Sequence, residues 1–353
     1  MVMQPDWIRR AIAVGNQFHY RKRNLVLHNA LNLSVLTLLL LVMFGVASAS
    51  MIVPLILYIP AAAVLFGLLY FALITLVNHE GCHGMFIVMK NRDTAQFWNR
   101  VFGWSLSLFF AMHFREDWEK GHHHEHHLRP IENDGVIYHH LLAGKDLLKR
   151  CAKIFFIPGY LFVFEKQLPQ EHKLVRRGRL GFIKPVTALL WLILGTVTTL
   201  AFGWVVPVAM FLGIHVVSVL QQIKLTLEHG GKIGQDQNRY FRSRTSLFPL
   251  RQLVMPLNIS MHFEHHLNYC VPWYDLPRYH RALRDVIPEH VQRHVFNRDV
   301  WPQLTGRKDV EISNILVLNR VSKEQAPAET LLPPVTTRLD SPDTAARGAH
   351  GSG

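Results

Sequence analysis

The stretch NLVLHNALNLSVLTLLLLVMFGVASASMIVPLILYIPAAAVLFGLLYFALITLVNH fills residues 24–79 and contains no Asp, Glu, Lys or Arg. A helix that crosses a membrane needs about 20 apolar residues, so this stretch has room for two such helices and a tight turn. Residues 185–223 form a second uncharged run of the same kind. Helices of a soluble core normally show a polar face at every turn, and neither run does. Both runs therefore predict pairs of membrane-spanning helices.

The predicted fold is an all-α integral membrane protein, with four transmembrane helices arranged as two hairpins and a cytosolic helical cap. The helices are expected at Leu25–Ala47, Ile52–Leu76, Pro185–Phe202 and Val206–Gln222. They belong to a membrane domain at residues 25–322, which follows a basic segment at residues 1–24. In residues 323–353, Pro, Thr, Ala and Ser dominate and no apolar period remains, so this tail is predicted to be disordered.

The basic residues predict which side of the membrane each segment faces. The chain carries 38 Lys and Arg against 25 Asp and Glu, a net charge of +13, and neither hairpin turn is basic. Under the positive-inside rule, the N-terminus, the segment between the hairpins and the C-terminal third face the cytosol. The expected location is the bacterial cytoplasmic membrane or the endoplasmic reticulum. Anionic headgroups account for the basic surplus, and no motif indicates nucleic acid as a partner.

Histidines gather in four places that this topology puts on the cytosolic side. GHHHEHHLRP spans residues 121–130, and HEGCH at residues 79–83 ends the second predicted crossing. In a helix, residues i, i+3 and i+4 share a face, so each motif directs two or three imidazoles toward one point. His122 and His124 are left open as ligands, because the second motif is over-supplied. The nine candidate metal ligands are His79, His83, His123, His126, His127, His229, His262, His265 and His266.

Nine imidazoles suffice for two metal ions with four or five nitrogens each. Imidazole suits zinc, copper, iron and nickel, and affinity alone does not choose among them. Zinc usually takes four ligands, so nine would require two zinc sites. Each histidine group also contains a glutamate, whose carboxylate can accept a hydrogen bond from an imidazole and balance the charge of the metal. These glutamates are Glu80, Glu125, Glu228 and Glu264.

Three histidine motifs carry a resemblance to a known family: HEGCH, HHEHH and HFEHH at residues 79–83, 123–127 and 262–266. With EHGG at residues 228–231 and NYCVPWYDLPRYH at residues 268–280, they resemble the membrane fatty acid desaturase superfamily. The resemblance runs roughly from Tyr70 to Leu283 and includes the spacing of the hydrophobic hairpins. It implies that the three motifs and His229 bind two irons that activate O2. The superfamily also contains lipid hydroxylases and carotenoid ketolases.

The predicted function is that of an oxygen-dependent di-iron lipid oxidoreductase that introduces a double bond into a fatty acyl chain. No side chain is oxidising enough to remove hydrogen from an unactivated methylene, whereas a metal centre can do so. Hydroxylation or ketone formation on a lipid or carotenoid is the alternative, and the motifs do not separate these outcomes. The chain lacks a haem-binding HPGG, a cysteine cluster and a flavin motif. Electrons are therefore expected from a separate ferredoxin, or from cytochrome b5 with its reductase.

Two other functions fit part of the pattern. His79-Glu80-x-x-His83 matches HExxH, the zinc protease motif in which Glu is the general base, with residues 133–135 as the third-ligand element. An intramembrane protease would leave the second and third histidine motifs without a role. A histidine-rich metal transporter would need polar ligands near the bilayer midplane, where these crossings have almost none.

Further polar residues lie outside these motifs. His215 is inside the fourth crossing, where it serves either a substrate channel or an ordinary hydrogen bond between helices. Arg239, Arg242 and Arg244 follow His229 and are expected to bind either an acidic substrate head or lipid headgroups. The apolar stretch at residues 100–114 is too short to span and is expected to lie at the membrane surface, like residues 153–164.

Overall fold

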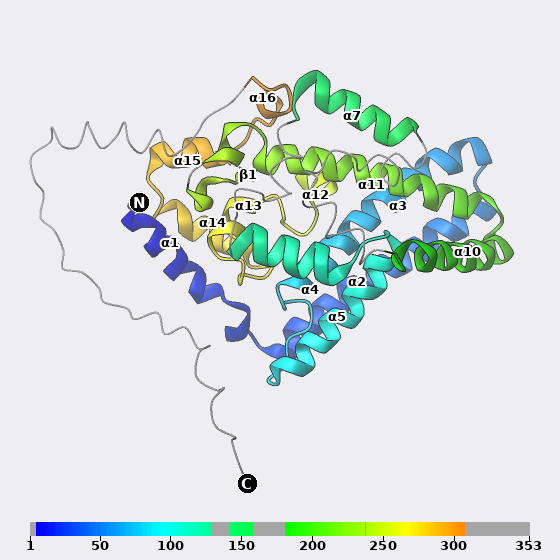
Figure 1. The fold of residues 1–353 in the computed structure, drawn as a ribbon, viewed down its shortest axis with the longest axis horizontal. Helices are drawn as coiled ribbons and strands as arrows, with labels where there is room; N and C mark the ends of the chain where they lie inside the picture. The colour runs from blue at the N-terminus through cyan, green and yellow to red at the C-terminus, as the bar shows by residue number, and fades with distance from the viewer. Residues whose placement is uncertain (1–4, 129–141, 158–180, 237, 308–353) are drawn as a thin grey trace, which may run out of the picture. The chain divides into compact units, whose positions relative to one another are not determined.

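The computed structural model describes residues 5–128, 142–157, 181–236 and 238–307 (Figure 1). The side chains of Glu125, Gln235 and Arg239 are outside this description, as are the tail predicted at residues 323–353 and the acidic turn at residues 133–135. The described chain is mostly helical. Its two strands, β1 (Thr245–Ser246) and β2 (Phe296–Asn297), pair in parallel. The helical class predicted from the sequence is therefore confirmed.

Within the described residues, four helical spans are long and apolar enough to cross a membrane, which confirms the predicted number. Their helices are α2 (Leu25–Ser48), α3 (Leu55–Leu73), α10 (Ile183–Phe202) and α11 (Val205–His229), and α3 continues through the π-helical η4 (Ile74–His79) into α4 (Glu80–Cys82). Asn24 starts α2 because its side chain accepts hydrogen bonds from two free backbone N–H groups. Gly203 ends α10 with a φ of 90°, a conformation that favours glycine.

The second and fourth spans run further than the sequence predicted, and the added turns carry histidines. The predicted ends were Leu76 and Gln222, whereas the spans continue to Cys82 and His229. A helix as long as α11 measures about 37 Å at 1.5 Å per residue, which exceeds a hydrocarbon core of about 30 Å. We therefore expect the last turns of both spans to project beyond the hydrocarbon and to hold their histidines there.

The four spans differ in how much protein covers them. Of the most apolar window of each span, 11% is buried for α2 and none for α10, against 56% and 50% for the spans containing α3 and α11. Large apolar side chains are bare on the outer helices; Leu200, for example, is 83% exposed. Continuous apolar surface of this extent indicates contact with lipid. The spans containing α3 and α11 thus form the centre, and α2 and α10 flank it.

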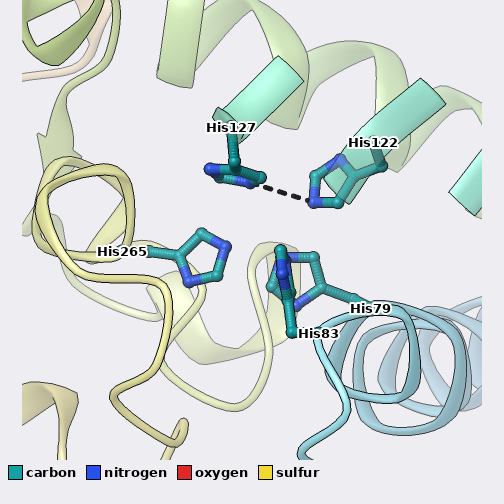
Figure 2. A group of neighbouring side chains, drawn as sticks. All are labelled: His79, His83, His122, His127 and His265. Carbon is teal, nitrogen blue, oxygen red and sulfur yellow. Dashed lines mark hydrogen bonds between the residues drawn. The ribbon is translucent and has the colours of Figure 1, made fainter. Parts of the chain in front are cut away.

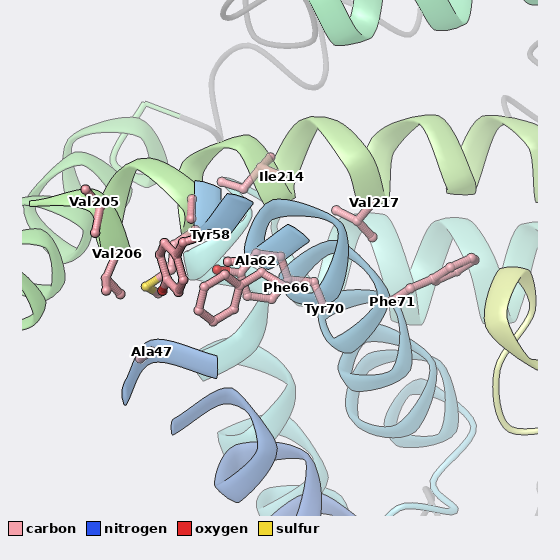
Figure 3. Close-up of a cluster of buried hydrophobic side chains, with 12 residues drawn as sticks. Ala47, Tyr58, Ala62, Phe66, Tyr70, Phe71, Val205, Val206, Ile214 and Val217 are labelled. Atoms are coloured by element: carbon pink, nitrogen blue, oxygen red, sulfur yellow. The ribbon is translucent and has the colours of Figure 1, made fainter. Parts of the chain in front are cut away.

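α3 and α11 pack through aromatic side chains of α3 (Figure 3). Phe66 and Tyr70 are each 1% exposed. The backbones meet at two glycines: a Cβ on Gly67 would lie 2.5 Å from Val216 Cγ1 and 3.1 Å from the carbonyl oxygen of Gly213. Small residues at a crossing allow two membrane helices to approach closely. The two glycines therefore set the distance between the central helices.

We expect Gly67→Ala to lower the melting temperature of the detergent-purified protein. The added methyl group has no space at this crossing, and overpacking typically costs about 1–3 kcal/mol. Gly45→Ala in α2 is the matched control, because a Cβ there meets nothing within 4 Å. Unfolding followed by tryptophan fluorescence should show the decrease for Gly67→Ala alone. Equal melting temperatures for the two variants would contradict this packing.

The other described helices carry the remaining histidine motifs and the segments that support them. The α- and π-helices are α1 (Asp6–Gly15), α5 (Arg92–Phe109), η5 (Phe114–Leu128), α7 (Gly144–Phe156), α12 (Arg251–Val254), α13 (His262–Leu267), α14 (Leu276–Arg284), α15 (Glu289–Val295) and α16 (Trp301–Leu304). The 3-10 turns are η1 (Asn16–Phe18), η2 (Tyr20–Lys22), η3 (Ala49–Met51), η6 (Lys232–Gln235) and η7 (Arg239–Phe241). The apolar end of α5 packs on α10, where Trp191 Nε1 donates to the carbonyl of Phe109 at 2.9 Å.

Polar side chains in the first turns of α2 fix the segments that follow two histidine motifs. His28 Nε2 lies 2.6 Å from the carbonyl oxygen of Met85, and Asn32 Nδ2 donates to that of Phe86 at 2.9 Å. Asn32 also accepts a hydrogen bond from Trp273 Nε1 at 3.0 Å. Buried polar groups of a membrane helix are costly unless they are paired in this way. The start of α2 thus ties the chain after HEGCH to the chain after HFEHH.

Candidate metal centre

The first histidine motif lies at the end of the second membrane span. η4 ends at His79, α4 follows, and His83 comes one turn later. The two imidazoles lie together, with ring centroids 4.9 Å apart. Both side chains are buried, at 4% and 6% exposed. The membrane helix therefore delivers two neighbouring imidazoles into the interior of the protein.

The second motif lies on η5, whose backbone has π-helical rather than α-helical hydrogen bonding. In a π-helix each N–H bonds to the carbonyl five residues earlier, so a side chain can meet the one five residues later, which lies on another face of an α-helix. His122 and His127 are five residues apart, and their Nε2 atoms are 3.2 Å from each other. The adjacent His126 points elsewhere and lies against His229, with ring centroids 4.8 Å apart.

The third motif lies on the short α-helix α13. Positions i and i+4 share a face, so His262 and His266 point the same way, and their Nε2 atoms are 3.1 Å apart. His265 is rotated from this pair and faces His79, at a ring-centroid distance of 4.6 Å. One helix thus contributes imidazoles in two directions.

These motifs form two groups of imidazoles. The five-histidine group contains His79, His83, His122, His127 and His265, which approach one another from three segments (Figure 2). The four-histidine group contains His126, His229, His262 and His266. The two groups adjoin, because the rings of His127 and His266 have centroids 4.3 Å apart. Segments far apart in the sequence therefore build one continuous cluster of nine imidazoles.

The distances within each group suit a metal ion. One nitrogen from each residue can be chosen so that all of them lie within 4.8 Å of one another. Two nitrogens on opposite sides of a single ion are separated by about 4.2 Å, twice a typical metal–nitrogen distance. Each group therefore needs to contract by less than about 1 Å to hold an ion.

Unpaired nitrogens in the interior also fit a metal. Among the described residues, the Nε2 atoms of His79, His83 and His265 are buried and have no hydrogen-bond partner, and neither has Nδ1 of His127. Buried polar atoms are nearly always paired in proteins. Several buried imidazole nitrogens without a partner in one cluster of histidines are the arrangement expected of metal ligands.

Burial also keeps these imidazoles in the form that binds metals. Burial, assisted by the positive charge of Lys224, lowers the pKa of His265 to about 3. Burial likewise lowers the pKa of His83, His122, His127, His262 and His266. A neutral imidazole has a free lone pair on one ring nitrogen, whereas an imidazolium has none. At neutral pH these imidazoles of the cluster are therefore neutral, and each offers a nitrogen lone pair to a metal ion.

Eight of the nine histidines predicted from the sequence belong to the two groups, and His123 does not. Its Nδ1 lies 2.8 Å from Nδ1 of His83, at the edge of the cluster, and burial lowers its pKa to about 4. His122, which the sequence left open, occupies the place expected for His123. The π-helical backbone of η5 lets His122 meet His127 five residues later, whereas the prediction assumed α-helical spacing. His124 is exposed and lies outside both groups.

Two of the four predicted glutamates lie against imidazoles of the groups. Glu80 Oε1 is 3.4 Å from His79 Nδ1, and Glu228 Oε1 is 3.4 Å from His262 Nδ1. Both carboxylates are buried, at 2% and 0% exposed. A carboxylate beside the outer nitrogen of a ligating imidazole orients the ring and makes it a better donor. The side chain of Glu125 falls outside the described part of the chain.

Glu264 makes different contacts from those the sequence suggested. It is fully buried, accepts a hydrogen bond from Thr245 Oγ1, and has Oε1 2.5 Å from His280 Nδ1. His280 belongs to α14 and closes the motif NYCVPWYDLPRYH. Glu264 therefore anchors α13 to β1 and α14, which fixes the helix that carries the third histidine motif. Sequence reasoning missed His280, although it is the last residue of the quoted motif.

Lys224 is a second residue that the sequence analysis did not single out. It is 6% exposed, and its Nζ is 2.7 Å from Glu228 Oε2, one turn further along α11. A buried lysine is costly unless it is paired, so this contact compensates both charges. The order Lys224, Glu228, His262 forms a line of polar contacts that ends at the four-histidine group. The available signal was a lysine at the end of an uncharged run of 39 residues, spaced four residues before a glutamate.

Arg242 and Arg244, two of the arginines after His229, support the structure beside the metal centre. Arg244 is 3% exposed and donates to the carbonyl of Gly230 at 2.5 Å. The carbonyl of Arg242 lies 2.5 Å from His229 Nδ1 and orients that ring. The buried Arg244 therefore has a structural role rather than the predicted contact with headgroups. His215 Nδ1 lies 2.7 Å from the carbonyl of Ile154 in α7, the hydrogen bond between helices that was one of its two predicted roles.

Four helices suited to a membrane and two adjoining histidine groups suited to metal define a membrane protein with a histidine-rich metal centre. The profile of the family described as Fatty acid desaturase matches residues 54–297, which include both groups. The chain belongs to the fatty acid desaturase family. This confirms the resemblance found in the histidine motifs, and the family indicates an oxidoreductase. Comparisons with curated proteins and with solved structures give no match.

Proposed function

We propose that this protein is a membrane-bound di-iron lipid oxidoreductase that uses O2 to introduce a double bond into a fatty acyl chain. The observation that carries the proposal is the pair of adjoining, buried histidine groups in a chain of the desaturase family. Zinc is redox-inert, and removal of hydrogen from an unactivated methylene requires a redox-active metal. Imidazole is a good ligand for iron, so the donor set is compatible with this chemistry.

The two histidine groups and the charged residues beside them would together hold two irons. The five-histidine group and the four-histidine group would each hold one ion, and once bound the pair supplies the oxidising power that side chains lack. η5 and α13 each give imidazoles to both groups, which fixes the distance between the two sites. Glu80 and Glu228 orient His79 and His262, and Lys224 balances the charge of Glu228. These contacts pre-organise the donors before the metals bind.

The proposed C–H oxidation ends either in an alkene or in an alcohol. Loss of a second hydrogen gives desaturation, and capture of oxygen gives hydroxylation; carotenoid ketone formation belongs to the same alternative. The outcome depends on where the methylene lies relative to the metals, which the histidine motifs do not encode. We propose desaturation because the matching family is named for it.

Lipid mass spectrometry on cells with and without the protein tests this proposal. We expect a class of acyl chains to lose two hydrogens when the protein is present, because a double bond replaces two C–H bonds. Cells that produce His265→Ala are the control for effects of membrane overproduction. A gain of one oxygen atom would replace desaturation by hydroxylation, and unchanged lipids with a metal-loaded protein would contradict both.

We further propose that electrons come from a separate ferredoxin or from cytochrome b5, which docks on the cytosolic side through charge. Three arginines of α14, Arg278, Arg281 and Arg284, are exposed, whereas His280 on the opposite face contacts Glu264 behind the third histidine motif. An acidic carrier bound to these arginines would lie on the opposite face of α14 from the contact between His280 and Glu264. Attraction between exposed charges raises association rates and is screened by salt.

Inside-out membrane vesicles test both the partner and the side of the membrane. Donor added outside such vesicles should reduce the centre, and the rate should fall several-fold between low salt and about 0.5 M salt as screening shortens the range of the attraction. Right-side-out vesicles are the control and should show no reduction. Reduction from the opposite side, or a rate independent of salt, would contradict this part of the proposal.

A further inference from the structure

A cavity of 310 Å³ lies against the metal centre, on the side of the N-terminal helix. His126, His127 and His266, which belong to the two histidine groups, line one wall. Ile12 of α1 and Asn16 of η1 line another part, and Asn268 to Cys270 complete it. The cavity is partly open rather than enclosed, so it connects the imidazoles with the outside of the described chain.

The wall formed by α1 is held firmly in place. Asn268 Nδ2 donates to Asn16 Oδ1 at 3.0 Å, and Tyr279 hydroxyl donates to the carbonyl of Ala11 at 2.9 Å. Gly15 lies so close to α14 that a Cβ there would be 2.8 Å from a ring carbon of Tyr279. These contacts join α1 to the segment that directly follows the third histidine motif. The cavity is therefore a built feature of the fold.

The lining of this cavity mixes polar and apolar side chains, with Ile12, Leu128 and Leu267 beside several polar groups. Asn16, His19 and Asn268 contribute amide and imidazole groups, and Tyr240 and Tyr269 contribute phenol rings with hydroxyl groups. Pockets for hydrocarbon are lined predominantly by apolar side chains with only a few polar groups. Water and small polar solutes, in contrast, find hydrogen-bond partners at such walls.

The chemistry of the proposed function requires a polar route to the buried centre. When O2 oxidises a C–H bond with the help of two external electrons, two protons are taken up and water is released, whether the product is an alkene or an alcohol. The oxidation consumes electrons from the external carrier, so the protons must come from solvent. The exposed side chains of α3 and α11 include Val64, Leu65 and Phe211, and an apolar surface of this kind supplies neither protons nor an exit for water.

We propose that this cavity is the port through which water, protons and small water-soluble anions reach the metal centre, with α1 as its wall. The inference rests on the proposed metal centre and adds a route that is separate from the entry of the lipid. A small anion that binds iron, such as azide, should therefore use this port. A bulky side chain placed on the wall should obstruct it without touching the ligands.

The test compares two tryptophan variants on the same helix. Ile12→Trp places an indole in the cavity, and Ala13→Trp is the matched control because Ala13 is exposed on another face of α1. Binding of azide to the iron-loaded protein, followed by stopped-flow absorption, should slow by at least about five-fold in Ile12→Trp and stay unchanged in Ala13→Trp, an effect of about 1 kcal/mol on the barrier. Ile12→Ala should bind azide at least as fast as the parent.

A second readout does not depend on iron. Cys270 also lines the cavity, so a small anionic thiosulfonate should label it more slowly in Ile12→Trp than in Ala13→Trp, with Cys151 replaced by serine in both. If the purified protein contained no iron, the proposed function would be refuted. The labelling of Cys270 would still show whether the cavity admits small anions. The proposed port would be contradicted if Ile12→Trp left the rates of azide binding and of Cys270 labelling unchanged. It would also be contradicted if Ile12→Ala lowered these rates as much as Ile12→Trp does.

Discussion

Replacement of His265 by alanine is expected to empty the five-histidine group and to abolish lipid oxidation. His265 is 1% exposed, and its ring lies 4.6 Å from those of both His79 and His127, measured between centroids. It is the one contribution of α13 to that group. Loss of an outer partner of a ligand alone costs about 10- to 100-fold in metal affinity, so loss of a ligand should cost more than about 100-fold.

Elemental analysis and product assay of the purified variant measure this effect together. Iron content should fall from two ions per chain to one or fewer, and no desaturated lipid should form. His124→Ala is the matched control, because His124 belongs to the same histidine-rich segment but is exposed and outside both groups. A His265→Ala protein that keeps both irons and full turnover would exclude His265 as a metal ligand.

The second large effect is a difference in metal binding between alanine variants of two neighbouring histidines, His122 and His123. We expect His122→Ala to lose metal from the five-histidine group, and His123→Ala to retain it. His122 Nε2 is 3.2 Å from His127 Nε2, whereas His123 contacts only the edge of the cluster through His83. The π-helical hydrogen bonding of η5 allows residues five apart to meet, which α-helical geometry does not. An α-helical second motif would predict the opposite order.

Metal affinity of the two variants, measured by competition with a chelator, decides between these alignments. His122→Ala should release its metal at a chelator concentration at least about 100-fold lower than the parent does, and His123→Ala within about ten-fold of the parent. Retention by His122→Ala together with loss from His123→Ala would show that the second motif is α-helical when metal is bound.

The membrane spans could be predicted from the sequence because they depend on composition over long windows. Absence of charge across residues 24–79 and residues 185–223 is sufficient to indicate four crossings. The ends of the second and fourth spans were less predictable. The helices run on to Cys82 and His229, and in these last turns Glu80 and Glu228 are buried against His79 and His262. Such pairing is not visible in hydropathy.

The histidine motifs predicted a metal centre, but they did not predict how the imidazoles divide between two groups. That division depends on helix type: α13 separates His265 from His262 by α-helical geometry, whereas η5 pairs His122 with His127 by π-helical geometry. Helix type over a few turns is set by packing in the folded protein. The contact between Glu264 and His280 is likewise a tertiary contact, so the sequence indicated the glutamate and not its partner.

The central claim is that two adjoining groups of imidazoles hold a pair of irons that oxidises lipid. Metal content of the full-length protein, purified in detergent and measured by plasma mass spectrometry against amino-acid analysis, tests it most directly. The proposed function predicts two irons per chain, one for each of the two histidine groups, which offer at least four nitrogens each. One zinc per chain, as in a protease of the HExxH type, or variable and substoichiometric metal, as in a transporter, would contradict it.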